Sequence, residues 1–212
     1  MELYWAQGSV SSWRVVLALL FKELEVDDRL LDMANRDHVQ IGYTSLNPRG
    51  RVPTLVDGEV VVAEPLAILG YLDRAYPRLP LFGATSADAA RIWQKVVDID
   101  TFLTPAALPT AHTLGRQLRL EQPLLGELRE KVAEVLVELD RLEAHCERGP
   151  FNAVDAMLVP VLAVLKRASL MRGADQVGLL PLDWSRWAQL LERYEGVKKL
   201  EGFARSWPPH WQ

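Results

Sequence analysis

A proline opens the most strand-like segment of the chain, and that position restricts how the segment can join a sheet. Residues 47–56 read NPRGRVPTLV, a loop rich in Pro and Gly that runs into a short apolar stretch. Because proline has no N–H to donate to a strand ladder, it is tolerated only at a strand start, an edge or a bulge. The Val52–Pro53 bond can be cis at a cost of about 0.5–1 kcal/mol. A cis bond would turn the backbone of Val52 towards a peptide-like ligand; an ordinary turn is the alternative.

The first 77 residues alternate strand and helix signals, which predicts an α/β layout around a mixed sheet. Ser11 or Ser12 can cap a first helix. Pro65 suits the first turn of a later helix, because an N–H there has no intrahelical partner, and Pro77 ends that helix. Asp57-Gly58 between two apolar runs is a strong hairpin signal. The segments expected as strands are Glu2–Trp5, Arg29–Asp32, Thr54–Val56 and Val60–Val62.

Strand signals stop at residues 78–85, whose Pro and Gly content indicates a linker. Beyond this linker the apolar positions follow the 3.6-residue helical rhythm. Asn152 and Asp155 form a capping-box pattern ahead of an almost wholly apolar helix, which predicts the buried centre of a bundle. We therefore expect one domain over residues 1–77 and an all-helical domain over residues 86–212. The expected helices are 86–108, with breakers at Pro105 and Pro109, then 125–146, 152–165, 184–194 and 197–203.

Charge and composition exclude several classes of partner. The net charge is −4 and no basic block occurs, so nucleic acid is not an expected partner. The longest apolar run, Val15–Phe21, is too short to span a bilayer, and the first residues lack the pattern of a secretion signal. The lone Cys146 allows no internal disulfide, and no metal-ligand spacing is present. We expect a cytoplasmic protein without a metal or a membrane partner.

Four blocks of the chain match the pattern of one known family in order and spacing. The blocks are YWAQGS with SWRV at residues 4–9 and 12–15, NPRGRVPTL at 47–55, the segment 64–72, and FNAVD at 151–155. With these blocks the chain resembles the cytosolic glutathione transferases over essentially its whole length, and it is most similar to the serine-type zeta and delta classes. The resemblance implies a thioredoxin-like N-terminal domain that binds glutathione as co-substrate, an all-α helical bundle and a homodimer. It also implies a hydrophobic second-substrate site between the domains.

Ser9 is the residue to which the resemblance assigns the catalytic role. It lies between the first strand and the first helix, where a hydroxyl can donate to the sulfur of glutathione and the positive end of the helix helps. An isolated serine is usually only a turn residue, and the match to the family reverses that expectation. Ser11 is the second candidate. Tyr4 lies near the position of the catalytic tyrosine of other classes, but its spacing to Gly8 is one residue short.

The resemblance places further glutathione contacts in the middle of the N-terminal domain. The backbone of Val52, ahead of Pro53, would pair with the cysteinyl backbone of glutathione. Arg51 would hold the glycyl carboxylate or point to solvent. His38 falls where delta-type enzymes contact that carboxylate, although a lone surface histidine usually has no such role.

Glu64 and Pro65 complete the expected glutathione site, and Pro65 departs from the family. Glu64 would accept from the γ-glutamyl amine. The family normally has a serine at the next position, whose hydroxyl and N–H both bind the γ-glutamyl carboxylate. Pro65 has neither group, so two donors are lost, each worth about 1.5–3 kcal/mol to a charged acceptor.

The second-substrate site is expected near His112 and Arg116, although a solvated polar loop is the alternative. Arg167 follows Val159-Pro160 at the spacing where zeta-type isomerases keep an arginine for a substrate carboxylate. Its neighbour Lys166 departs from the acidic residue of that class, and a surface helix charge is the alternative for Arg167.

Three functions follow from these residues. The leading hypothesis is a glutathione transferase that activates the glutathione thiol for attack on a small hydrophobic electrophile. The reaction could be conjugation, reductive dehalogenation, ether cleavage or cis–trans isomerisation. The alternative, favoured by Pro65, is a non-catalytic binding or dimerisation module of the same fold. A third hypothesis is a carrier of a small apolar ligand.

Overall fold

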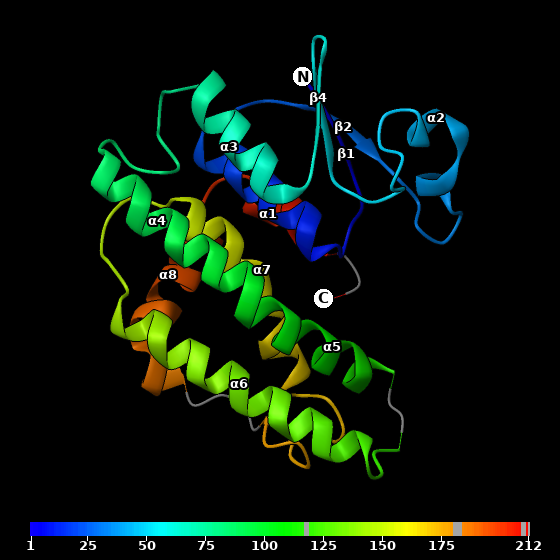
Figure 1. Ribbon diagram of the computed structural model, residues 1–212, viewed down its shortest axis with the longest axis vertical. Helices are drawn as coiled ribbons and strands as arrows, with labels where there is room; N and C mark the ends of the chain where they lie inside the picture. The colour runs from blue at the N-terminus through cyan, green and yellow to red at the C-terminus, as the bar shows by residue number, and fades with distance from the viewer. Residues whose placement is uncertain (117–118, 180–183, 209–210, 212) are drawn as a thin grey trace. The chain divides into compact units, whose positions relative to one another are not determined.

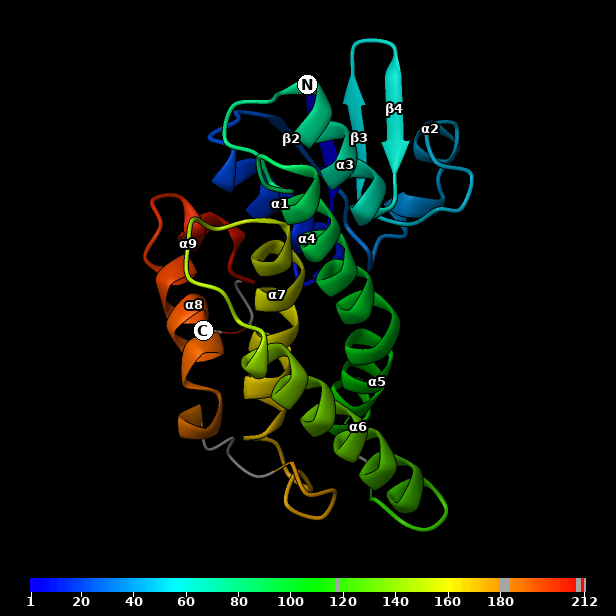
Figure 2. The same ribbon diagram turned by 60° about the vertical axis from the view of Figure 1, so that its left-hand side comes forward.

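A four-stranded mixed sheet lies at the centre of the N-terminal part of the computed structural model, which describes residues 1–116, 119–179, 184–208 and 211 (Figure 1). Its order is β2-β1-β3-β4, with β1 parallel to β2 and antiparallel to β3. The second strand begins two residues earlier than predicted, because Asp27 pairs with Glu2 at the start of β1. The strands are β1 (Glu2–Trp5), β2 (Asp27–Leu30), β3 (Thr54–Asp57) and β4 (Val60–Ala63). The mixed sheet and the hairpin between β3 and β4 are confirmed (Figure 2).

Two helices pack against each other beside this sheet, α1 (Val10–Phe21) and α3 (Pro65–Ala75). Leu3 and Leu55 from the sheet and Leu17, Ile68 and Leu72 from the helices are fully buried. Two shorter turns, η1 (Asp37–Val39) and α2 (Ile41–Thr44), connect β2 to β3. This arrangement confirms the α/β layout that the strand and helix order predicted, and it is the thioredoxin-like fold that the family resemblance implied.

The described helices of the C-terminal part are joined by loops and turns, and no strand occurs among its described residues, in agreement with the prediction. The apolar helix α7 (Ala153–Ala168) is buried along most of its length. Its capping box is confirmed, because the Asn152 N–H donates to Asp155 Oδ2 and the Val154 N–H donates to Asn152 Oδ1, each at 2.9 Å. The helices are α4 (Ser86–Asp98), η2 (Ile99–Leu103), α5 (Thr104–Gly115), α6 (Leu124–Ala144), α7 (Ala153–Ala168), η3 (Trp184–Trp187), α8 (Ala188–Lys198) and α9 (Phe203–Ser206).

The expected breaks at Pro105 and Pro109 are wrong, because helical structure runs without interruption from Ser86 to Gly115. The η2 segment is a π-turn in which the Thr104 N–H donates to the Ile99 carbonyl, one residue further back than in an α-helix. The widened turn lies immediately before Pro105, where the proline ring would clash with a carbonyl of the preceding turn. The last predicted helix is also displaced: α8 ends at Lys198, and α9 begins after Gly202, which has φ 85°.

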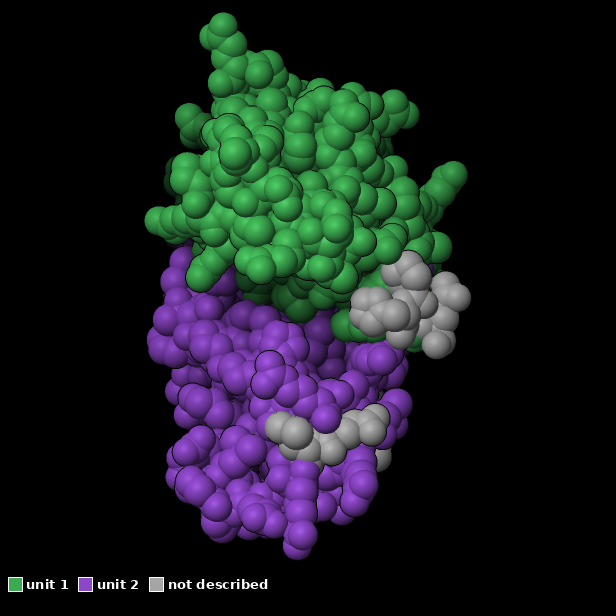
Figure 3. All heavy atoms as spheres, turned by 90° about the vertical axis from the view of Figure 1, so that its right-hand side faces the viewer, with its two compact units in different colours: residues 1–86, 151–156, 199–212 green, residues 87–150, 157–198 purple. Residues whose placement is uncertain are grey.

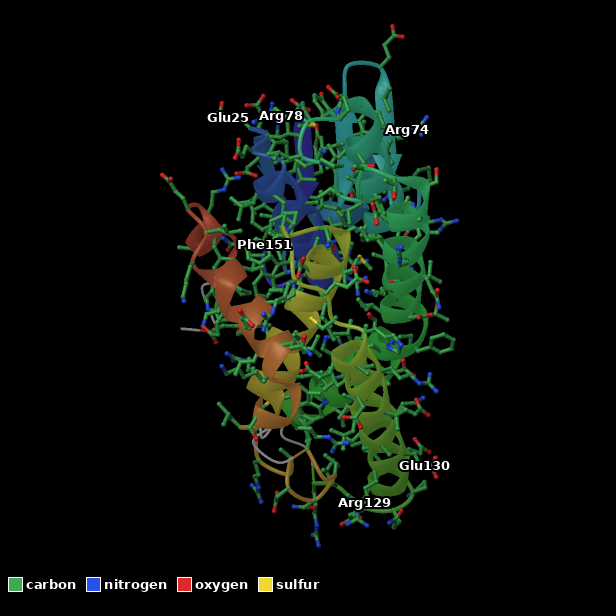
Figure 4. All side chains as sticks on the ribbon, turned by 90° about the vertical axis from the view of Figure 1, so that its left-hand side faces the viewer. Glu25, Arg74, Arg78, Arg129, Glu130 and Phe151 are labelled. Atoms are coloured by element: carbon green, nitrogen blue, oxygen red, sulfur yellow. The ribbon has the colours of Figure 1, made fainter. Side chains whose placement is uncertain are left out.

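Two compact units divide the chain, and neither is continuous in sequence (Figure 3). The first contains residues 1–86, 151–156 and 199–212, and the second contains 87–150 and 157–198. Within the first unit, Phe151, labelled in Figure 4, stacks on Phe21 with ring centroids 5.5 Å apart. The proposed boundaries at residues 77 and 86 stay a prediction.

Membrane spans and metal clusters are both absent from the described residues. None of the described helices is both long enough and apolar enough to cross a membrane. No group of His, Cys, Asp and Glu side chains in the described part of the chain could hold a metal ion.

Candidate functional site

Ser9 caps helix α1, so the expectation that Ser11 or Ser12 caps it is wrong. Gly8, with φ 79°, turns the chain after β1, and Ser9 then has the extended backbone of an N-cap residue. Its Oγ atom accepts the N–H of Ser12 at 3.2 Å. Ser12 lies inside the helix, fully buried, and its own Oγ accepts the Ala6 N–H at 3.4 Å. Ser11, the second catalytic candidate, lies in the first helical turn.

The cap leaves the chemistry of the Ser9 hydroxyl intact. A hydroxyl has one proton to donate and two acceptor lone pairs, and the cap uses a lone pair. Among the described residues none accepts the Ser9 proton. The helix behind it has 12 residues and no acidic side chain in its first turn, so its positive end is not neutralised locally. The position is therefore suited to donating a hydrogen bond to an anion.

Val52 precedes β3 with its peptide groups unused. The Val52–Pro53 bond is cis, as in the first of the two interpretations of this segment. The pairing of β1 with β3 ends at Tyr4 and Thr54, and no other described residue hydrogen-bonds the backbone of Val52. Val52 is half-buried and Pro53 is buried. The N–H and C=O of Val52 are available to an extended peptide.

A buried polar network holds the loop that ends at Val52. The Tyr43 hydroxyl donates to the Arg51 carbonyl and lies 2.8 Å from Thr54 Oγ1. The amide of Asn47 donates to the same carbonyl at 2.7 Å and to Thr54 Oγ1 at 3.2 Å. Tyr43, Asn47 and Thr54 are only 4%, 5% and 0% exposed, and burial raises the pKa of Tyr43. The Arg51 side chain itself is exposed.

Tyr43 and Asn47, like Arg49, lie near the site and were not singled out from the sequence. Asn47 was visible as the first residue of the NPRGRVPTLV segment, where a short amide suits a turn. Nothing in the local pattern indicates Tyr43, because its partners are eight and eleven residues away.

Glu64 has an unusual backbone and a charged neighbour. Its φ of 71° and ψ of 126° are uncommon for a residue with a side chain, and such conformations cost about 1–3 kcal/mol. Glu64 caps α3 without a side-chain bond to the helix, and Pro65 occupies the first helical position, as predicted. The Glu64 carboxylate instead accepts from Arg49 Nη1 at 3.2 Å.

His38 lies beside the same loop. It belongs to η1, and its carbonyl oxygen would be only 3.0 Å from a Cβ atom placed on Gly50. Gly50 has φ 58°, so both its backbone angle and this close approach exclude a side chain. His38 Nδ1 is buried and has no hydrogen-bond partner within the described residues.

The Tyr4 side chain makes its contacts with neighbouring residues of the N-terminal part. Its hydroxyl donates to Glu2 Oε2 at 3.0 Å, and its ring contacts Tyr43 at a centroid distance of 5.9 Å. Burial and the Glu2 carboxylate raise the pKa of Tyr4. These contacts agree with the spacing argument against a catalytic tyrosine at this position.

Asp57 connects helix α3 to the end of β3. It accepts from Tyr76 and, at 2.9 Å, from Tyr71. The Tyr76 hydrogen bond, together with that of Tyr71, lowers the pKa of Asp57, and the Asp57 carboxylate raises the pKa of Tyr76 to about 12. These bonds link β3 to the far end of α3, the helix that begins at Pro65 directly after Glu64.

The predicted second-substrate residues belong to two helices of the second unit. His112 and Arg116 are exposed at the end of α5, where the Arg116 N–H donates to the His112 carbonyl at 3.2 Å. Arg167 is half-buried near the end of α7. Its neighbour Lys166 pairs with Glu195 at 3.5 Å. A common role for the three predicted residues stays a prediction.

Comparison with known proteins shows which family shares this arrangement. A family model described as glutathione S-transferase, N-terminal domain, matches residues 1–74. Glutathione S-transferase Z1 of Arabidopsis thaliana is 37% identical over 209 residues, which cover 98% of this chain and 91% of that protein. A crystal structure of a glutathione S-transferase from the Antarctic clam Laternula elliptica superposes with a TM-score of 0.78 at 25% identity, covering 100% of this chain and 94% of the clam protein.

A second solved structure has the same fold. The holo structure of a bacterial maleylpyruvate isomerase, described as a zeta-class glutathione S-transferase, gives a TM-score of 0.72 at 19% identity and covers 98% of this chain and 97% of the isomerase. The near full-length similarity to the plant enzyme and the shared fold lead to one conclusion: the chain belongs to the glutathione S-transferase family.

Proposed function

We propose that this protein uses Ser9 to lower the pKa of the glutathione thiol and directs the thiolate at a small hydrophobic electrophile. The observation that carries the proposal is the Ser9 cap, in which the oxygen binds the Ser12 N–H while the hydroxyl proton keeps no acceptor among the described residues. A donor at the positive end of a helix favours the charged form of a sulfur placed against it.

The size of the required effect is modest. A free thiol has a pKa of about 8.5, and one unit of depression corresponds to about 1.4 kcal/mol. A depression of two units would raise the thiolate fraction at pH 7 from about 3% to about 75%. One charge-assisted hydrogen bond of about 1.5–3 kcal/mol, together with the helix dipole, supplies that free energy.

The remaining contacts follow the tripeptide along the first unit. The free backbone groups of Val52, ahead of Pro53, pair with the cysteinyl residue. We assign Arg51 and His38 to the glycyl carboxylate; Gly50, the neighbour of Arg51, lies against the His38 carbonyl, which supports this assignment. The Glu64 carboxylate accepts from the γ-glutamyl amine.

Residues of the second unit supply the proposed electrophile contacts and the proposed dimer surface. We assign His112, Arg116 and Arg167 to the electrophile, and we expect a cytoplasmic homodimer. Trp93, Val97 and Phe102 are exposed apolar residues on α4 and η2, and a spacing of four and then five across the π-turn is consistent with a single face. A second copy of the chain is the partner that we expect there.

Two substitutions at Ser9 separate the cap from the catalytic donor. Ser9→Ala removes both, whereas Ser9→Asp keeps a good N-cap but has no proton to donate at neutral pH. We expect both variants to lose the ultraviolet signal of bound thiolate in a pH titration, while only Ser9→Ala loses about 1 kcal/mol of stability. Ser9→Thr is the matched control that keeps both roles. A thiolate that persists in Ser9→Asp would refute the assignment.

The non-catalytic module is the second candidate because Pro65 fills the first position of α3. Calorimetric titration distinguishes the two functions. No binding at millimolar glutathione would favour the module, and binding with a Ser9-dependent thiolate would favour the enzyme.

A further inference from the structure

Arg49 and Glu64 place opposite charges side by side at the amino end of α3. Arg49 Nη1 lies 3.2 Å from Glu64 Oε1, and Pro65 follows directly. We propose that Arg49 binds the α-carboxylate of the γ-glutamyl residue of glutathione and so replaces the donors that Pro65 lacks, while Glu64 binds the neighbouring ammonium. This inference rests on the proposed use of glutathione.

The head group of an α-amino acid matches this arrangement of charges. Its ammonium and carboxylate are attached to the same carbon, so a receptor needs an acceptor and a donor that are also neighbours. The Glu64 carboxylate is such an acceptor, and the planar guanidinium of Arg49 can bind a carboxylate through two parallel N–H groups.

The helix end adds to the attraction for the carboxylate. The first intrahelical bond of α3 runs from the Ile68 N–H to the Glu64 carbonyl, so the N–H groups of Leu66 and Ala67 have no partner within the helix. The first turn of α3 contains no acidic residue that would compete with a bound carboxylate. Pro65 removes one donor from this end, and Arg49 brings several from the neighbouring loop.

The Arg49 head group is free to rearrange while its base is held. The side chains of Arg49 and Glu64 are 72% and 55% exposed, and exposed ion pairs contribute little stability, so a ligand can insert between them at low cost. The Arg49 N–H donates to Asn47 Oδ1 at 3.2 Å. Asn47 itself is buried in the network around Arg51 and Thr54, which fixes the start of the arginine side chain.

Tripeptides that lack one charge test the proposal directly. Calorimetric titration would use glutathione, 4-aminobutyryl-cysteinyl-glycine, which lacks the α-carboxylate, and glutaryl-cysteinyl-glycine, which lacks the ammonium. We expect wild-type protein to prefer glutathione over the first analogue by about tenfold, the equivalent of one charged hydrogen bond. In Arg49→Gln this preference should fall to about twofold or less, whereas the preference over the second analogue, which reports on Glu64, should largely persist.

Arg78→Gln is the matched control. Arg78, labelled in Figure 4, is 70% exposed and pairs with the exposed Glu23 at 2.8 Å. Glu23 follows the C-terminal end of α1, whereas Ser9 caps the other end of that helix. The control should bind all three tripeptides as the wild type does. Pro65→Ser in the Arg49→Gln background should restore glutathione binding, because it returns a hydroxyl and an N–H to the helix end.

Each outcome bears on one of the two proposals. If Arg49→Gln binds glutathione as tightly as the wild type or more tightly, Arg49 is a spectator or a competitor for Glu64, and the inference fails. The inference also fails if this variant weakens glutathione and the analogue without the α-carboxylate by the same factor. If either of these outcomes occurs and the wild-type protein still binds glutathione, only the role of Arg49 is refuted and the proposed function stands. If the wild-type protein binds none of the tripeptides, both the role of Arg49 and the proposed function are refuted.

Discussion

The buried network around Arg51 and Thr54 predicts that substitutions at Tyr43 and Asn47 have coupled effects on the free energy of unfolding. Tyr43→Phe removes a hydroxyl that contacts the Arg51 carbonyl and Thr54 Oγ1, but the Asn47 amide still bonds to both. At about 0.5–1.5 kcal/mol for each of the two bonds, and with neither partner left without another bond, we expect a loss of about 1–3 kcal/mol in the free energy of unfolding. Asn47→Ala loses two donated bonds and the one accepted from the Arg49 N–H, and we expect a loss of about 2–4 kcal/mol.

The double variant should lose more than the sum of the two. Thr54 is 0% exposed, and without Tyr43 Oη and Asn47 Nδ2 its hydroxyl keeps neither of the partners described for it. An unsatisfied buried hydroxyl costs about 1–3 kcal/mol, which appears as the coupling term of a double-mutant cycle. Adding Thr54→Val to the double variant should recover part of this coupling free energy, because the unsatisfied Thr54 hydroxyl is then removed.

Urea unfolding at one fixed protein concentration measures all of these variants, since a dimer would make stability depend on concentration. Tyr4→Phe is the matched control, because among the described residues its hydroxyl bonds only to Glu2 at the start of β1, and its loss should stay below about 0.5 kcal/mol. Additive effects of Tyr43→Phe and Asn47→Ala, within about 0.3 kcal/mol, would refute the reasoning.

Two further predictions concern the elements around the site. The hydrogen bond from Tyr76 lowers the pKa of Asp57, so the stability that Asp57 supplies is present above pH 4 and is lost as the pH falls. Asp57→Asn should therefore cost about 1–3 kcal/mol at pH 7, and the difference between the urea midpoints of wild type and variant should shrink as the pH falls below 4; a constant difference would contradict this. The fully buried Lys22 donates to the carbonyls of Arg78 and Leu79 at 3.2 and 3.0 Å. Lys22→Met should cost about 1–3 kcal/mol and speed trypsin cleavage after Arg78, and unchanged cleavage would contradict it.

The sequence predicted those parts of the fold that depend on near neighbours. Asp57-Gly58 gave the hairpin, and Asn152 with Asp155 gave the start of α7, because each signal acts over four residues or fewer. The predicted cap of α1 was displaced because three serines within four positions all suit an N-cap, and only the Gly8 turn selects Ser9. Pro105 did not end its helix, because a π-turn formed directly before it. Such a turn has no characteristic residue type from which it could be predicted.

The residues of the candidate site that belong to a sequence motif were predictable. The residues that reach the site through tertiary contacts were not. Ser9, Val52 and Glu64 follow from recognisable blocks of the chain, and their assigned roles stay predictions. Tyr43 became visible only when folding brought it under the Arg51 carbonyl. The Arg49–Glu64 pair joins residues fifteen positions apart, and its charge arrangement could not be read from either segment alone.

The surroundings of Trp13 have a consequence for how the chain acquires its structure. The indole N–H of Trp13 donates to Ser206 Oγ at 2.9 Å, and its ring contacts Phe203, Trp207 and Trp211. All of these partners are translated almost two hundred residues after Trp13. During synthesis the flank of α1 therefore stays uncovered until residues 203–211 have been translated, and a fragment ending at residue 86 would expose that indole to water and to chaperones.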